Sequence, residues 1–114
     1  MDVFEMKFSK VFPLLIAKAV RKGRTEEEVF AVTGWLTGYS EEELRALLDC
    51  DATYGAFLDG APCMNPERFL VKGKICGVRV EEIVDPRMRD LRILDKLVDD
   101  LAKGKPIDKI LMKN

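Results

Sequence analysis

The segment from Pro86 to about Lys103 carries the longest helical pattern in the chain, and it limits the folds that the chain can adopt. Apolar residues recur in this segment at spacings of three and four. They are Met88, Leu91, Leu94, Val98 and Leu101, and Ile93 and Leu97 widen the stripe. A helix with so wide an apolar face needs other elements to cover it. The pattern predicts a core built around this helix. It also leaves a homodimer open, since one small core can be too narrow for the stripe.

Capping signals and glycines divide the rest of the chain into shorter helices. Thr25 with Glu28, and Ser40 with Glu43, fit the capping box that begins a helix. The expected helices run from about Ser9 to Gly23, from Thr25 to Gly38, from Ser40 through Leu48, from Thr53 to Leu58 and from Pro106 onward. Before them, residues 1–8 alternate apolar and charged side chains, which predicts a short strand or a docked arm.

The length and composition of the chain agree with one helical domain. The 114 residues are 47% hydrophobic and 34% charged, which is ordinary for a globular chain. A chain of this length can bury a core without disulfide bonds. We therefore expect a single domain over residues 1–114 with an all-α fold. Its form would be a small orthogonal bundle of about five helices, with a short extended segment or hairpin around residues 71–83.

The chain shows no feature of a secreted or membrane-bound protein. Its first ten residues, MDVFEMKFSK, contain Asp2 and Glu5 and lack the apolar stretch of a signal peptide. No uncharged apolar run in the sequence is long enough to span a bilayer. We therefore expect a cytoplasmic protein that does not act at a membrane.

The residue types that are missing limit the chemistry available to the chain. Histidine is absent, which removes the commonest metal ligand and the usual general base near neutral pH. The three cysteines, Cys50, Cys63 and Cys76, are not spaced as a zinc or disulfide motif. We therefore expect no metal and no cofactor. We favour a non-catalytic domain that binds a protein or a small ligand over an enzyme.

The stretch VKGKICGVRVEEIVDP, residues 71–86, raises the clearest question about a binding site. It fits neither the P-loop nor the dinucleotide-binding pattern of glycines. Gly73 and Gly77 could form a nest of backbone N–H groups that binds an anion. The basic side chains around such a nest would be Lys72, Lys74 and Arg79. Alternatively, the glycines make a tight turn that carries apolar residues into the core, and we favour this interpretation.

Cys76 lies within the same stretch and also has two interpretations. Because it follows Ile75, we expect it to be buried as a small hydrophobic residue. A reactive thiol would need a basic neighbour, which Lys74 or Arg79 could supply. A small thiol-dependent enzyme is therefore the second alternative function.

A nucleic-acid-binding module is the first alternative function. Basic residues gather in the C-terminal half of the chain, but acidic residues are interleaved with them, which favours a solvated face with ion pairs. A helix-turn-helix over residues 29–48 would place Glu41, Glu42 and Glu43 against phosphates, which repel carboxylates. We therefore do not expect nucleic acid to be the partner.

Four segments of the chain together resemble a known family. They are KGRTEEEV, WLTGYSEEEL, GKICGVRVEEIVDP and LDKLVDDLAKGKPIDKIL. Their combination is similar to a family of small bacterial proteins known as domain of unknown function 2200, and the resemblance covers nearly the whole chain. It implies a bacterial protein and a compact, mostly helical bundle. It implies no activity and no site residues, because the family has none assigned.

Overall fold

The computed structural model describes residues 2–111, and helices account for most of them. The α-helices are α1 (Phe8–Arg21), α2 (Glu26–Thr37), α3 (Glu41–Leu48), α4 (Tyr54–Asp59), α5 (Pro86–Ala102) and α6 (Ile107–Ile110). The 3-10 helices are η1 (Val3–Glu5), η2 (Pro66–Leu70) and η3 (Val80–Glu82), and the strands are β1 (Lys74–Ile75) and β2 (Val78–Arg79). The expected all-α fold with a short hairpin is confirmed, with six α-helices in this part of the chain where about five were predicted. None of these helices combines the length and the apolar character needed to cross a membrane.

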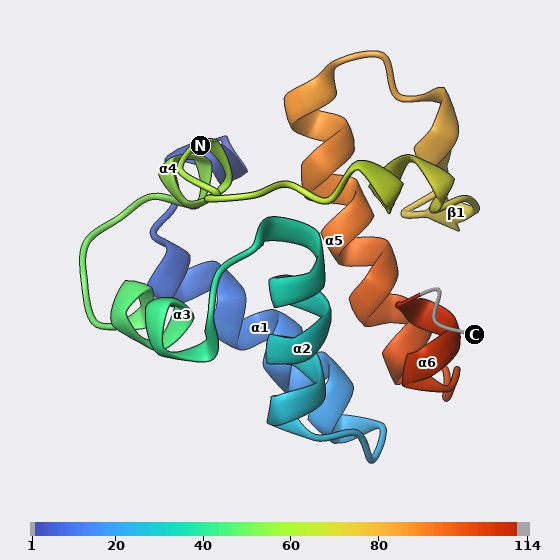
Figure 1. Cartoon of the computed structure of the whole chain (residues 1–114), viewed down its shortest axis with the longest axis horizontal. Coiled ribbons are helices and arrows are strands. Elements are labelled where there is room, and N and C mark those ends of the chain that lie inside the picture. Colours follow the sequence, from blue (N-terminus) through green and yellow to red (C-terminus); the bar gives the residue numbers. More distant parts are fainter. Residues whose placement is uncertain (1, 112–114) are drawn as a thin grey trace.

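α5 is the element on which the others pack. α1 and α2 make the most extensive contacts with it, and β1, η3, α4 and α6 contact it as well. Figure 1 shows α1 and α2 to one side of α5 and the hairpin to the other. The chain between α4 and α5 crosses from one side to the other before it returns to begin α5 (Figure 1). The hairpin region therefore covers the flank of α5 that α1 and α2 leave open.

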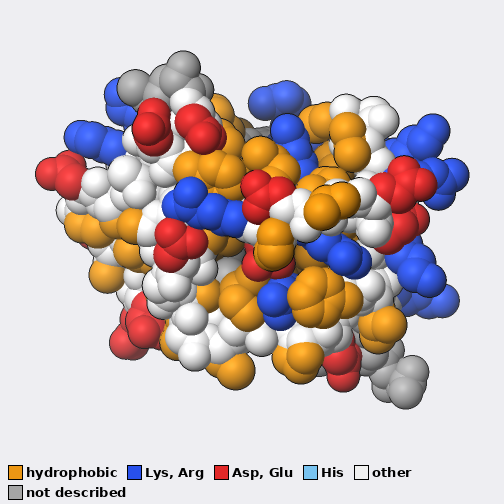
Figure 2. Space-filling model, turned by 90° about the horizontal axis from the view of Figure 1, so that it is seen from above, with side chains coloured by type: hydrophobic (Ala, Val, Ile, Leu, Met, Phe, Trp, Pro, Cys, Tyr) orange, Lys and Arg blue, Asp and Glu red, His pale blue; other side chains and the backbone are white. Residues whose placement is uncertain are grey.

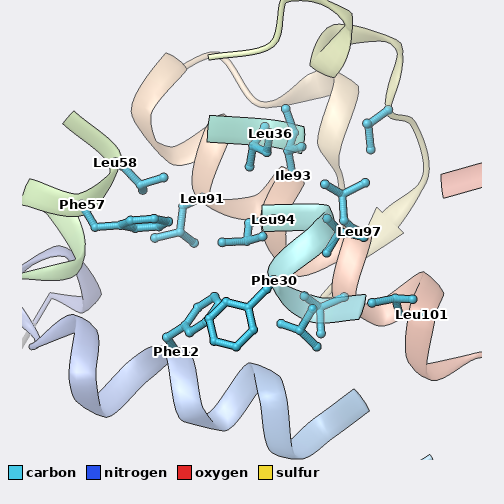
Figure 3. Packing of buried hydrophobic residues seen from close by; sticks show 14 of the residues in the cluster. Phe12, Phe30, Leu36, Phe57, Leu58, Leu91, Ile93, Leu94, Leu97 and Leu101 are labelled. Carbon is cyan, nitrogen blue, oxygen red and sulfur yellow. The ribbon is translucent and has the colours of Figure 1, made fainter. Parts of the chain in front are cut away.

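The apolar stripe of α5 is buried within the chain itself. Its buried members are Leu91, Ile93, Leu94, Leu97, Val98 and Leu101, each at most 3% exposed. Figure 3 shows Leu91 near Phe57 of α4, with Phe12 of α1 and Phe30 of α2 side by side below Leu94. One small core therefore covers these residues, so the width of the stripe gives no reason to expect a homodimer.

Hydrogen bonds confirm the predicted starts of α2 and α3. The Thr25 hydroxyl accepts from the Glu28 N–H at 3.2 Å, and Glu28 Oε1 accepts from the Thr25 N–H at 3.0 Å. Ser40 and Glu43 exchange the same pair of bonds. α2 ends at Gly38, whose φ of 82° is the left-handed conformation that favours glycine. Both capping boxes and this glycine therefore act as the sequence predicts.

The N-terminal residues differ from the predicted strand. Val3–Glu5 form a 3-10 turn, and Lys7 makes an isolated β-bridge to Thr53. α1 then begins at Phe8, earlier than predicted. Phe8 is fully buried, and its ring centroid lies 4.8 Å from that of Phe12 on the next turn. Burial of these two rings on one helical face therefore outweighs the alternating pattern.

Arg24, in the turn between α1 and α2, joins three parts of the chain. Its Nη2 donates to Glu28 Oε2 at 2.6 Å. Its Nη1 donates to the carbonyl oxygens of Leu101 at 3.1 Å and Lys105 at 2.8 Å. The last carbonyl groups of a helix lack partners within the helix, so Arg24 satisfies one of those that end α5. The start of α2 and the turn after α5 are thereby fixed to each other.

We expect the Glu28→Gln substitution to lower the free energy of unfolding by about 1 kcal/mol at pH 7. It removes a charge-assisted hydrogen bond, whereas glutamine can still complete the capping box. Hydrogen bonds from Arg24 and from the Thr25 N–H lower the pKa of Glu28 from 4.5 to about 2. The carboxylate therefore stabilises the fold fully above pH 4.5, and its contribution disappears as the pH falls towards 2.

Urea unfolding of both proteins between pH 7 and pH 2 measures this effect. The wild-type protein and the Glu28→Gln variant should converge in stability as the pH falls. Glu27→Gln, which changes an exposed neighbouring carboxylate, is the matched control and should have little effect at any pH. If the free energies of unfolding of the wild-type protein and the Glu28→Gln variant differ by the same amount down to pH 2, the account is contradicted.

Candidate functional site

The two strands form the predicted hairpin, and its turn explains one of the two glycines. β1 and β2 pair in antiparallel register, and β1 carries Ile75 into the core, where it is 6% exposed. The two-residue turn has a φ of 53° at Cys76 and 79° at Gly77. Two consecutive positive φ angles are what a type I′ hairpin turn requires. Gly77 is therefore needed for the turn.

Gly73, just before β1, has a positive φ that favours glycine, and its N–H is bound by a carboxylate. Its φ is 118°, and a Cβ at this position would lie 2.8 Å from Lys96 Cε. Its N–H donates to Glu81 Oε1 at 3.0 Å. That hydrogen bond, with Arg79 and Lys72 nearby, lowers the pKa of Glu81. The Glu81 carboxylate therefore already accepts the hydrogen bond of the Gly73 N–H, the group that the sequence suggested for binding an external anion.

The five residues predicted to bind an anion lie in different settings. Gly77 is in the hairpin turn, and the Gly73 N–H already has a partner. Lys74 and Arg79 are exposed and stand opposite each other on the two strands. Lys72 instead lines a pocket together with residues of α5 and α6. Anion binding by all five together stays a prediction, whereas the pocket at Lys72 offers a new candidate site.

This pocket, of about 210 Å³, lies where the chain approaches the hairpin alongside α5 and α6. Three segments line it: the end of η2 with the two residues after it, one face of α5, and the turn into α6 with α6 itself. Its apolar lining is Leu70, Val71, Leu97 and Ile110, and its charged lining is Lys72, Asp100, Lys105 and Lys109. Three lysines and one aspartate thus line a partly apolar cavity, which we call the lysine pocket.

The carboxylate of the lysine pocket already has partners. Asp100 Oδ1 lies 2.6 Å from Lys96 Nζ, and both side chains are less than 15% exposed. Asp100 Oδ2 lies 3.9 Å from Lys105 Nζ. Lys72 and Lys109 form no ion pair with another residue of the described range 2–111. The pocket therefore keeps an excess of positive charge that an anionic group could neutralise.

Contacts distant in the sequence shape this pocket. Arg24 donates to the carbonyl oxygen of Lys105, and Gly104, with a φ of 91°, turns the chain just before it. Sequence reasoning assigned Lys105 and Lys109 to a solvated basic face and did not connect them with Lys72. No local spacing could have revealed this meeting, because the three lysines come together only when the segment before the hairpin packs on α5 and α6.

Cys76 is exposed, which corrects the prediction that it is buried. Its neighbour Ile75, the last residue of β1, is the buried one, whereas Cys76 is the first residue of the hairpin turn and points away from the core. Arg92 Nη1 lies 3.7 Å from Cys76 Sγ and 3.2 Å from Asp95 Oδ2. The basic neighbour of the thiol therefore comes from α5, whereas the sequence suggested a basic residue of the hairpin.

We expect Cys76 to react with a thiol reagent in the native protein, because it is exposed in the turn of the hairpin. Ellman's reagent should titrate all three cysteines without denaturant, since Cys50 and Cys63 are exposed as well. The Cys76→Ser variant should lose one equivalent. The thiol-enzyme alternative further requires Cys76 to react much faster than Cys50. A Cys76 thiol that reacts only after denaturation would contradict the exposed position.

Elsewhere on the surface, charges of both signs are mixed. Figure 2 shows one face on which hydrophobic side chains lie among basic side chains (Lys and Arg) and acidic side chains (Asp and Glu). On α5, Arg92 pairs with Asp95 and Lys96 pairs with Asp100. Across the described part of the chain, no three His, Cys, Asp or Glu side chains gather in a way that could hold a metal ion. The lysine pocket is therefore the candidate that we develop below.

Comparison with known proteins identifies relatives but no activity. Residues 2–112 match the family DUF2200, described as an uncharacterized protein conserved in bacteria. A crystal structure of the uncharacterized protein SP1917 is similar, with a TM-score of 0.93 and 53% sequence identity over 98% of this chain and 93% of that chain. No curated protein matches the chain. The similarity to SP1917 supports the helical fold, and neither description names a ligand or a reaction.

Proposed function

The chain belongs to DUF2200, a bacterial family of uncharacterised proteins, and we propose that it is a non-catalytic binding domain whose lysine pocket takes a small anionic group. The main support is the convergence of Lys72 with Lys105 and Lys109, from two segments distant in the sequence, on one pocket. The single carboxylate there, Asp100, is already paired with Lys96. An added anion would therefore meet ammonium groups that lack a full set of partners.

An anionic group with a short apolar part fits this lining best. Lys72, Lys105 and Lys109 are exposed, so an opposite charge that pairs with them gains a modest electrostatic attraction. The side chain of Leu70, which is 59% exposed, favours hydrocarbon beside that charge, whereas Leu97 and Ile110 are 2% exposed and offer little surface. The volume of about 210 Å³ is smaller than the roughly 300–1,000 Å³ of pockets for drug-sized ligands. The ligand is therefore a small organic anion or the anionic end of a larger molecule.

Nucleic-acid binding is the alternative function, and the charge distribution argues against it. Duplex phosphates form an extended line of charge, and proteins that bind them use a correspondingly extended basic surface. The three lysines line one pocket beside Asp100, and ion pairs neutralise Arg92 and Lys96 of α5. Binding of the protein to immobilised DNA or RNA tests the alternative. Binding that falls steeply with salt, and that weakens in the Lys72→Glu and Lys74→Glu variants, would favour it.

We expect 4-methylpentanoate, a carboxylate with a branched apolar tail, to bind the lysine pocket. The neutral 4-methylpentanamide, of nearly the same shape, should not bind. Titration of backbone amide signals by NMR measures both, with shifts expected around Lys72 and α6. Substitution of Lys72, Lys105 or Lys109 by glutamine should each weaken binding by about two- to fivefold, because pairs of partly exposed charges contribute about 0.5–1 kcal/mol.

Two exposed lysines outside the pocket supply matched controls. Lys22→Gln, at the end of α1, should leave the affinity unchanged. Lys74→Gln, on β1, separates the lysine pocket from the hairpin. Weaker binding in Lys74→Gln but not in Lys109→Gln would place the anion near Gly73 and contradict the proposal. Equal binding of the acid and the amide would contradict it as well.

A further inference from the structure

Beside the lysine pocket, the end of η2 carries exposed apolar side chains that a small ligand in the pocket would leave uncovered. Leu70 lines the pocket and is 59% exposed, and the preceding residue, Phe69, is 46% exposed. The guanidinium carbon of Arg89 lies 4.9 Å from the centre of the Phe69 ring. Exposed apolar surface with charged groups at its edge is typical of contacts with another chain. The pocket and this surface together therefore suggest a ligand longer than the pocket itself.

We propose that the lysine pocket binds the C-terminal end of a peptide chain. The terminal carboxylate lies among Lys72, Lys105 and Lys109, and the last side chain, an apolar one, lies against the exposed Leu70. This inference rests on the proposed function, because it identifies the anionic group that the pocket takes. Capture of a chain-terminal carboxylate is a known mode of peptide recognition.

The lining matches the chemistry of a terminal residue. In such a residue the carboxylate and the side chain branch from the same carbon atom, so a pocket for both must place cationic and apolar groups close together. An internal glutamate carries its carboxylate on a flexible stem and would leave the exposed side chain of Leu70 without an apolar partner. A free amino acid adds an ammonium group, which the three lysines repel. In a peptide that nitrogen is a neutral amide.

The peptide residues that precede its C-terminal residue can lie on a neighbouring surface of the protein. The partly exposed Leu70 stands at the pocket, and Phe69 extends the apolar surface beyond it. Arg89 forms no ion pair with another residue in the described part of the chain, so an acidic side chain of the peptide would find a cationic partner there. The fitting partner is therefore an apolar C-terminus preceded by an acidic residue.

Isothermal titration of the full chain with three pentapeptides tests this inference. The first peptide ends in leucine with a free carboxylate, and the second is the same peptide amidated. The third is amidated and ends in glutamate, so its charge equals that of the first. We expect the first to bind at least about tenfold more tightly than the other two, because only that peptide carries a carboxylate and an apolar side chain on one carbon atom.

A parallel titration with 4-methylpentanoate separates this inference from the proposed function. If 4-methylpentanoate binds and the free-acid peptide binds no more tightly than the two amides, the inference is overturned and the proposed function stands. If neither the acid nor any peptide binds, both are overturned. These comparisons use the wild-type chain and so do not depend on the folding of a variant.

A substitution outside the pocket tests the surface that the peptide crosses. Phe69→Ala should weaken the affinity for the free-acid peptide by about three- to tenfold, because it removes exposed apolar contact area. It should leave the affinity for 4-methylpentanoate unchanged. Leu14→Ala, which changes an exposed leucine of α1, is the matched control and should alter neither affinity. Equal peptide binding by the wild-type protein and the Phe69→Ala variant would overturn the proposed path over Phe69.

Discussion

Burial of the apolar stripe of α5 is the constraint on which the rest of the structure depends. Six side chains of this 17-residue helix are nearly inaccessible to water, so the helix needs neighbours on more than one flank. α1 and α2 cover one flank, and the chain between α4 and α5 crosses over to cover another, carrying Val71, Ile75 and Val80 into the core. The lysine pocket forms where this crossing segment meets α5 and α6. It is therefore a consequence of how the central helix is covered.

The helix boundaries in the middle of the chain were predictable because capping is local chemistry. A hydroxyl and a carboxylate three residues apart, as at Thr25 and Glu28, specify the same hydrogen bonds in any surroundings. The N-terminal segment was not predictable in this way. Its conformation depends on Phe8, whose ring packs 4.6 Å from that of Phe57 of α4, and a local pattern contains no information about so distant a contact.

The candidate site was predictable only in its parts. The glycines before and within the hairpin indicated a turn, and Gly77 supplies it. The partner of the Gly73 N–H, Glu81, could not be inferred, because spacing alone does not show which of several carboxylates folds back. The exposure of Cys76 was missed because burial was inferred from its neighbour Ile75, although Cys76 lies in the turn that follows β1. The meeting of Lys72 with Lys105 and Lys109 is purely tertiary, and the Arg24 contact that holds the turn at Lys105 is tertiary as well.

A crystal structure of the chain with 4-methylpentanoate at saturating concentration tests the central claim most directly, because it locates the anion. The account predicts the carboxylate within hydrogen-bonding distance of Nζ of Lys72, Lys105 or Lys109, with the branched tail against Leu70. An acid bound instead between Lys74 and Arg79 on the hairpin would contradict the account, and so would a lysine pocket that holds no acid under these conditions.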